Sequence, residues 1–516
     1  MALARPAPVS NASAPATSGH SSGIGIVSTD SRWVRSLDFA IFGALVLFAI
    51  TLPYSIKGAE RSWKLALVLW LLKLVVDRSR PYKQPLAGPL LAYVTLSAIS
   101  TVLSPDPYLS WDRMKFVCLY LVGIVVAQNL KRVSQVRWLV VILVLSGFSA
   151  ALFTAWQYTY GVGVRLVDFP PGSRLSHAGL QPEDIVTTFN AHRIYTQEQL
   201  IRAVQTATPR SAVTVEYLRW RALRPAATSA TPEDFVQSGL GTPAMKLARG
   251  KPVRAQGTLG HYVVFAEMLM QIGCMAWALM IATGRGQLGW RVFFGIAFLG
   301  ITAAMFATET RAAIVGLVVG CLLALLLLIR GIRRTTAIVV LLAILAGAIL
   351  WIQHSRRIEW VDRKDIGTQF RVLMWEDGIR LVREHPWFGV GMETVRVHYR
   401  EWNIRGFIQY NVQSHFHSTF LQIAVERGIP ALLAWLWFSV AYFVFLFRLI
   451  WRLRTQSRFA CGVAAGALAG FTAFTLSSVV HYNLGEESLA MILFFYYGLA
   501  AAMDRMTATP GALDVG

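Results

Sequence analysis

The sequence predicts an all-α polytopic membrane protein with about twelve transmembrane helices, a small α/β insert and a second, helical loop. Of its 516 residues, 55% are hydrophobic and only 15% are charged. A soluble domain carries about 25% charged residues. The mean hydropathy is +0.49, and apolar runs of about 20 residues, the length that crosses a bilayer, recur along the chain. These observations exclude a soluble enzyme, a disordered scaffold and a fibrous protein.

The net charge of the chain is +21, a balance that in a soluble protein would suggest nucleic acid as a partner. In a membrane protein, basic cytoplasmic loops and anionic ligands account for this charge more simply, so we expect no nucleic-acid partner. The four cysteines each lie inside an apolar run and form no CxxC pair: Cys118, Cys274, Cys321 and Cys461. They are expected to pack as small core residues and to form no disulfide framework.

The predicted spans form three blocks along the chain. Five lie within residues 36–158, four within 258–353, and three within 429–516, a block that ends in a cytoplasmic C-terminus. The spans are 36–56, 62–77, 86–104, 113–130, 137–158, 258–282, 289–306, 311–330, 335–353, 429–449, 459–479 and 486–503. Residues 1–35 are rich in Ala, Ser, Gly and Pro and are predicted to be a disordered cytoplasmic tail. No small-residue cleavage site follows the first span, so we expect a retained helix and not a signal peptide.

Lysine and arginine in the short loops predict the orientation, because positive residues favour the cytoplasmic side. Loops after even-numbered spans are basic, as at 330–334, whereas the opposite loops at 104–112 and 481–487 contain no Lys or Arg. The first outer loop is an exception to this rule, because it contains basic residues although it is expected on the outer side. Twelve spans with both termini in the cytoplasm fit the pattern and leave two long outer segments, 159–257 and 354–428, as the places where chemistry is expected.

Residues 159–225 are predicted to form a small α/β domain on the outer, periplasmic side. Alternating residues at 163–167 and 213–218 indicate strands, and residues 197–205 have helical spacing. Residues 226–257 contain Pro, Ala, Thr and Gly and are expected to be a linker to the sixth span.

Four short sequences in this domain follow one another in a familiar order. They are Pro171-Gly172-Ser173, Ala178-Gly179-Leu180, Glu183-Asp184-Ile185 and the strand 214–219. Together they resemble a bacterial PDZ domain, although Glu183 stands where that family usually has Gly. The resemblance implies a peptide or protein partner that adds a strand to a sheet edge. A structural insertion that binds nothing is the alternative.

The second outer segment, residues 354–428, is predicted to be a helical loop rich in aromatic residues and histidine. Residues 371–384 have helical spacing, and Gly389 and Gly391 lie beside aromatic residues in a sequence that predicts a tight turn. A Gly-x-Gly of this kind is a weak sign of phosphate binding.

A further helix is predicted to begin near Ser418 and to run to Gly428. His417 then lies at its N-terminal edge, at the membrane surface. A neutral imidazole in this place can act as a general base, because histidine titrates near neutral pH. The alternative is a surface histidine bonded to a backbone carbonyl. His385, His398 and His481 are possible helpers, but they are expected to be structural.

Two arginines lie at the outer ends of predicted spans, against the usual charge bias. Arg254 precedes the sixth span and Arg311 opens the eighth. A single arginine in such a place would extend to lipid headgroups. Two arginines and a histidine on the same face favour an anion site, since guanidinium groups match the geometry of phosphate.

The chain thus contains, in order, Arg254 with Gly257-Thr258, the span start Glu309-Thr310-Arg311-Ala312-Ala313, the turn 385–391 and the helix start His417-Ser418-Thr419-Phe420-Leu421-Gln422. Their order and topology resemble the O-antigen ligase and O-antigen polymerase-like membrane glycosyltransferases of the GT-C type. Ser418 departs from the family, which usually has Asn after the histidine.

The resemblance implies a metal-independent, inverting glycosyltransferase that needs no cofactor and works in lipopolysaccharide biosynthesis. Its donor would be a glycan on polyprenyl (undecaprenyl) diphosphate, and its acceptor a hydroxyl of the lipid A core or of a growing chain. It would lie among the lipids of the bacterial inner membrane with a periplasmic active site. The implied roles are general base for His417, diphosphate binding for Arg254 and Arg311, and helpers for His415, Gly389 and Gly391.

Several alternatives stay open at this point. A polymerase or a protein O-glycosyltransferase of the same family would share this layout. A transporter of lipid-linked glycans is more remote, because the ionisable residues gather at one face. An intramembrane protease is disfavoured, since no HExxH occurs and the G-x-S-x-G match at 19–23 lies in the tail. A scaffold would need neither the arginines nor His417.

Overall fold

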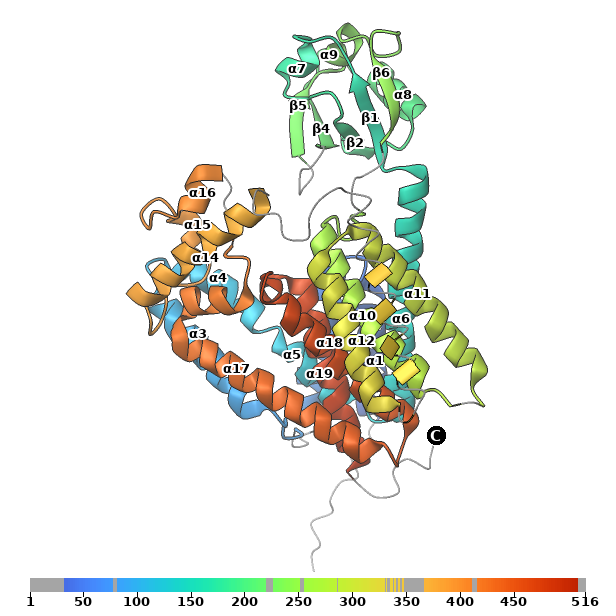
Figure 1. Cartoon of the computed structure of the whole chain (residues 1–516), viewed down its shortest axis with the longest axis vertical. Coiled ribbons are helices and arrows are strands. Elements are labelled where there is room, and N and C mark those ends of the chain that lie inside the picture. Colours follow the sequence, from blue (N-terminus) through green and yellow to red (C-terminus); the bar gives the residue numbers. More distant parts are fainter. Residues whose placement is uncertain are drawn as a thin grey trace, which may run out of the picture.

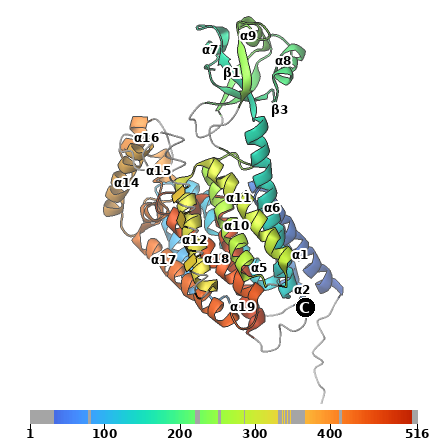
Figure 2. The same ribbon diagram turned by 45° about the vertical axis from the view of Figure 1, so that its right-hand side comes forward.

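The computed structural model describes residues 32–77, 81–219, 226–250, 255–284, 286–329, parts of 331–347, 366–410 and 415–508. These residues form a bundle of long helices, a β-domain and a group of short helices. The β-domain and the short helices stand at the same end of the bundle (Figure 1). Seen from a second direction, the β-domain continues from the extended end of helix α6 and stays clear of the short helices (Figure 2).

Most of the chain belongs to the helix bundle. Its helices are α1 (Arg32–Thr51), α2 (Ile56–Asp77), α3 (Ala87–Val102), α4 (Pro107–Val117), α5 (Tyr120–Asn129), α6 (Val133–Tyr160), α10 (Tyr262–Ala282), α11 (Leu288–Thr308), α12 (Arg311–Leu328), α17 (Thr419–Leu453), α18 (Arg458–Ser477) and α19 (Glu487–Thr507). Among the described residues, eight helices are long and apolar enough to cross a membrane: α1, α6, α10, α11, α12, α17, α18 and α19. The prediction of a mostly helical membrane protein is confirmed.

The predicted number of about twelve spans is not reached in the described part of the chain. The third predicted span forms α3, which has only 16 residues. The fourth is divided between α4 and α5, which are separated by a turn after Val117. Helix α4 also carries Asp112, Arg113 and Lys115, and charged side chains are costly in a lipid-facing helix. The ninth predicted span, 335–353, falls mostly outside the described residues.

Helix α18 lies at the centre of the bundle and packs closely against α10. Its glycines Gly462, Gly466 and Gly470 recur every four residues and so share one helix face. A Cβ atom on Gly466 would lie 2.6 Å from the Met275 sulfur of α10, and one on Gly462 would lie 2.7 Å from Ala282 Cβ. Small residues at this spacing let two membrane helices approach through their backbones. The close approach brings the outer ends of α10 and α18 together.

The insert between α6 and α10 is an antiparallel sheet with short helices. Its elements are β1 (Gly163–Asp168), α7 (Arg174–His177), β2 (Ile185–Phe189), β3 (His192–Arg193), α8 (Gln197–Thr206), β4 (Val213–Leu218), β5 (Ala226–Ala230), α9 (Pro232–Gln237) and β6 (Lys246–Gly250). The strand order is β5-β4-β2-β1-β6, with β3 paired to β2. The predicted strands β1 and β4 and the predicted helix α8 are confirmed. The PDZ resemblance and its peptide-binding role stay predictions.

The predicted linker over residues 226–257 is wrong for its first 25 residues, which complete the insert. Strand β5 pairs with β4, and β6 pairs with β1 from Gly163 opposite Gly250 to Asp168 opposite Lys246. Phe235, between the two strands, is buried in the same core. The small residues that suggested a linker are instead edge strands, whose hydrogen bonds need no particular side chain.

The second outer segment contains the short helices α14 (Ile366–Glu384), α15 (Thr394–Val397) and α16 (Arg405–Tyr410). The predicted helix over 371–384 is confirmed by α14. These helices share a small core with the start of α17, in which Met374, Phe407 and Phe416 are buried. Asp377 ties α14 to α16, because its Oδ2 accepts a hydrogen bond from the Arg405 backbone N–H at 2.8 Å.

The insert core predicts which fragment of the domain can fold by itself. A fragment of residues 161–250 should show a cooperative thermal transition by circular dichroism, whereas one that ends at residue 221 should not. The shorter fragment lacks β5, β6 and the buried side chains of Phe235 and Met245. In the longer fragment, Phe235→Ala should cost about 3–5 kcal/mol. Two fragments with the same melting midpoint would contradict this account of the domain boundary.

Candidate functional site

His417 lies in a constrained turn directly before α17. Its backbone has a φ of 49°, in the left-handed region that residues with a side chain rarely adopt. The next residue, Ser418, caps the helix by accepting a hydrogen bond from the Leu421 N–H at 3.4 Å. The helix start predicted near Ser418 is therefore confirmed. The serine that replaces the family's usual asparagine fills the same capping place, which short polar side chains favour.

Phe416, the residue before His417, is hydrogen-bonded through its backbone to two different helices. The Phe416 N–H donates to Gln422 Oε1 at 2.8 Å, and its carbonyl accepts from Trp375 Nε1 at 3.1 Å. Gln422 belongs to α17 and Trp375 to α14. Both helices must be in place for the turn to form, so the left-handed conformation of His417 is imposed by its surroundings.

The imidazole of His417 is half-buried among other rings. The ring centre of Phe370 lies 5.5 Å away, and that of His415 lies 4.4 Å away. Burial and, to a smaller extent, the nearby charges of His415, Arg371 and His481 lower the pKa of His417 from 6.5 to about 2. His417 is therefore neutral at physiological pH, as a proton acceptor must be. The same environment makes the protonated form of His417 unfavourable.

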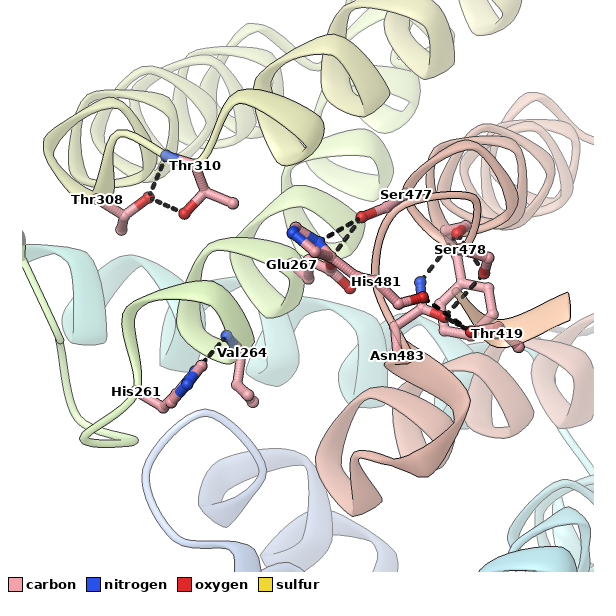
Figure 3. A network of polar contacts seen from close by, with 11 residues as sticks. His261, Val264, Glu267, Thr308, Thr310, Thr419, Ser477, Ser478, His481 and Asn483 are labelled. Atoms are coloured by element: carbon pink, nitrogen blue, oxygen red, sulfur yellow. Dashed lines mark hydrogen bonds and ion pairs between the residues drawn. The ribbon is translucent and has the colours of Figure 1, made fainter. Parts of the chain in front are cut away.

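A buried acidic residue lies behind this turn, at the outer end of α10. Glu267 is fully buried, and its Oε1 accepts a hydrogen bond from the Ser477 hydroxyl at the end of α18. The Nδ1 of His481 lies 2.5 Å from the same oxygen. Figure 3 shows Glu267, Ser477 and His481 pointing toward one another, with Thr419 and Asn483 on the adjoining segment.

His481 also touches the start of α17 through its backbone. Its carbonyl oxygen accepts hydrogen bonds from the N–H and the hydroxyl of Thr419, each at 3.1 Å. The Thr419 hydroxyl lies 2.8 Å from Asn483 Oδ1 as well. Sequence reasoning expected His481 to be structural and assigned Glu267 no role in the site. A carboxylic acid inside an apolar run was the available signal, because such residues are costly in membranes.

Arg311 is the first residue of α12 and follows a strained turn. Glu309 has a φ of 53°, and Thr310 stands at the N-cap position of the helix without a side-chain capping hydrogen bond. The Thr308 hydroxyl braces the turn by accepting from the Thr310 N–H at 3.3 Å. Arg311 is half-buried at this helix N-terminus, where the backbone dipole favours anions.

The segment that leads into α10 meets the same turn. The Ala255 N–H donates to the Ala307 carbonyl at 3.0 Å, near the end of α11. Arg254 itself lies outside the described residues. Gly257 has a φ of 60°, and a Cβ atom there would lie 2.4 Å from the Phe265 ring, so only glycine fits. Gly257 therefore has a packing reason of its own.

Gly389 and Gly391 form the predicted tight turn, which pairs with α17. Val390 and Gly391 donate to the carbonyls of Val425 and Glu426, both at 2.9 Å, and Gly389 donates to His385 O at 3.2 Å. A Cβ atom on Gly389 would lie 2.4 Å from the Glu426 carbonyl carbon. These three amides are used within the protein and are not available to a phosphate. The glycines support the site by close packing.

A buried ion pair anchors the other side of this turn. Glu426 Oε1 accepts from the Glu393 N–H and from Gln422 Nε2, each at 2.9 Å. Arg427 lies 3.6 Å from Glu426 Oε2 and also donates to the Tyr93 hydroxyl of α3. Gln422 thus links this pair to the backbone of the His417 turn. The pair fixes the start of α17 against α3, because an unpartnered buried charge would be costly.

Comparison with known proteins bears on one part of this site. Residues 295–436 match the family model described as O-Antigen ligase, which confirms the resemblance predicted from the sequence. The matched segment contains Arg311, Gly389, Gly391, His415 and His417. No curated protein matches the chain. Together with the apolar helices, the match supports a membrane glycosyltransferase of ligase or polymerase type.

The lowered pKa of His417 predicts how stability depends on pH. Above pH 6.5 this residue is neutral in both folded and unfolded chains, and below it only the unfolded chain takes up the proton. Stability should then fall as the pH falls from 7.5 to 5, by up to about 1.4 kcal/mol per pH unit below 6.5. The melting temperature of His417→Asn should fall less over the same range.

His192→Asn is the matched control, because His192 is exposed on β3. It should keep the pH dependence of the wild type. If His417→Asn also follows the wild type at every pH, His417 is not held neutral by its surroundings.

Proposed function

We propose that this protein is an O-antigen ligase-like glycosyltransferase. It moves a glycan from a polyprenyl diphosphate carrier to an acceptor hydroxyl at the periplasmic face of the bacterial inner membrane. The observation that carries the proposal is the placement of His417. An unprotonated imidazole is held in a strained turn within the segment that matches the O-antigen ligase family.

In the proposed reaction, the acceptor oxygen attacks the anomeric carbon of the donor glycan directly. The bond from that carbon to the diphosphate breaks, and its electron pair leaves with the diphosphate. His417 accepts the proton of the attacking hydroxyl. A single direct displacement of this kind inverts the anomeric centre. The proposal requires neither a metal ion nor a cofactor.

The leaving diphosphate is proposed to bind at the N-terminus of α12. Arg311 supplies a fixed positive charge there, and the helix dipole acts in the same direction. Arg254 is assigned the same task, since the next residue, Ala255, is bonded to Ala307 at the end of α11. A bound diphosphate would also offset the positive charge of Arg371. The pKa of His417 would then rise in the complex, and the base would be strongest when the donor is present.

We assign the lipid A core as the acceptor, with a growing glycan chain or a protein hydroxyl as the alternatives that the same chemistry would serve. In this assignment both termini lie in the cytoplasm and the insert lies in the periplasm. The insert and the start of α17 stand at the same end of the bundle, as a periplasmic site between them requires (Figure 1).

The proposed function predicts the outcome of a reconstituted transfer assay. Purified protein would be given an undecaprenyl-diphosphate glycan and lipid A core in the presence of EDTA. Wild type should transfer the glycan. His417→Ala should lower turnover by about 10²- to 10⁴-fold, because the proton acceptor is lost. Arg311→Ala should lower it by about 10²- to 10³-fold, because charge on the leaving group is no longer stabilised.

Arg291→Ala is the matched control for Arg311→Ala. Arg291 is exposed near the opposite end of α11 and should be dispensable for turnover. If wild type transfers no glycan to lipid A core, to a second glycan or to a protein, the proposed function is wrong. Undiminished transfer by His417→Ala would remove the general base from the proposal and leave the rest.

A further inference from the structure

A fully buried carboxylate is placed where the bundle's own stability does not require it. Glu267 lies in α10, a membrane-spanning helix, and none of its side chain is exposed. Its Oε1 meets Ser477 and His481, whereas Oε2 has no hydrogen-bond partner among the residues that the structure describes. An acid in this environment is costly, and ionisable residues inside membrane proteins commonly mark functional sites.

The contacts of Glu267 determine the tautomer of His481. An ionised carboxylate can only accept hydrogen bonds, so the Nδ1 of His481, which lies beside Oε1, is assigned as the protonated nitrogen. The carboxylate then accepts from Nδ1–H at 2.5 Å, which leaves Nε2 of the same ring unprotonated. A carboxylate that orients an imidazole in this way also stabilises the imidazolium, as in the Ser-His-Asp triad.

His481 and His417 belong to one hydrogen-bonded region. The His481 carbonyl holds the N–H of Thr419, two residues after His417. The ring of His415 lies between the two segments, with its centre 4.4 Å from that of His417 and 5.6 Å from that of Tyr482. His481 is also near enough to His417 for its charge to lower the pKa of His417.

We propose that Glu267 and His481 are positioning residues that receive the proton which His417 takes from the acceptor hydroxyl. This inference rests on the proposed function and extends it by two residues outside the segment that matches the family. The physical reason is the weakness of His417 as a store for protons. His417 is half-buried and lies near the charges of His415, Arg371 and His481, so it needs a second proton acceptor, and Glu267 places a negative charge against His481.

Protons and electron pairs balance in this step. The hydroxyl proton moves to His417 as the acceptor oxygen bonds to the anomeric carbon, and the bonding pair of the cleaved bond leaves with the diphosphate. His417 then gives a proton toward Nε2 of His481, which becomes an imidazolium beside the Glu267 carboxylate. The proton leaves from there to water, so that both histidines are neutral for the next turnover.

A purely structural role makes a different prediction. In that case the Glu267–His481 contact would only fasten α10 to the loop after α18, and its loss would lower stability without a particular effect on turnover. The two roles are separable, because Glu267→Gln keeps the size of the side chain and an oxygen that accepts from Nδ1–H. It removes the negative charge alone.

The test compares Glu267→Gln, His481→Ala and Gln271→Leu in the full-length protein, using the transfer assay above. We expect Glu267→Gln and His481→Ala to lower kcat by about 100-fold or more while KM for the donor changes less than about threefold. Added imidazole should restore part of the turnover of His481→Ala, which a structural role would not allow. Gln271→Leu is the control, because Gln271 lies one turn further along α10, is equally buried and should be dispensable.

Three results of this test would contradict the relay, and they differ in what they leave of the proposed function. Wild-type kcat in both Glu267→Gln and His481→Ala, with His417→Ala inactive, would overturn the relay and leave the proposed function standing. A loss of turnover in Glu267→Gln that only follows a lower melting temperature, with no rescue of His481→Ala by imidazole, would also overturn it. An inactive wild type would remove the proposed function and the relay with it.

Discussion

The close approach of α10 and α18 is the contact on which the site depends. Gly462 and Gly466 of α18 allow the two backbones to approach where side chains would otherwise hold them apart. At the outer end of this contact, Glu267 meets Ser477 and the loop that carries His481. That loop in turn holds the first residue of α17 through the Thr419 N–H. The position of His417 therefore follows from a packing contact made well inside the bundle.

The second support of the site is the turn at residues 385–391. Its backbone pairs with α17 from Val425 to Ile429, where Gly428 has a φ of 81° and the helix is kinked. The Ile429 N–H, which a straight helix would bond internally, donates instead to the Pro386 carbonyl at 2.7 Å. The kink divides α17 into two parts with different surroundings. Its first two turns face the site, and the remainder crosses the bundle.

The sequence predicted the parts of this protein that follow local rules. Apolar runs predicted the long helices, and Ser418 predicted a helix start that the structure confirms. Contacts between distant segments were not predictable in this way. The Glu267–His481 pair joins residues 214 positions apart, and nothing in the residues around either one points to the other. The edge strands β5 and β6 were missed for a related reason, since their small residues gain order only from the strands that they pair with.

The site also shows how a membrane protein can keep polar groups at little cost. Most ionisable residues of the site lie at helix ends, where backbone groups are free to bond and where charge is less costly than in the interior. The Glu426–Arg427 pair is buried within α17, and Glu267 lies near the outer end of a helix that is almost wholly enclosed by its neighbours. Ser477 and His481 satisfy one of its oxygens, and the other has no partner. In the proposed relay, the negative charge that Glu267 brings into this environment is explained by the histidine that it orients.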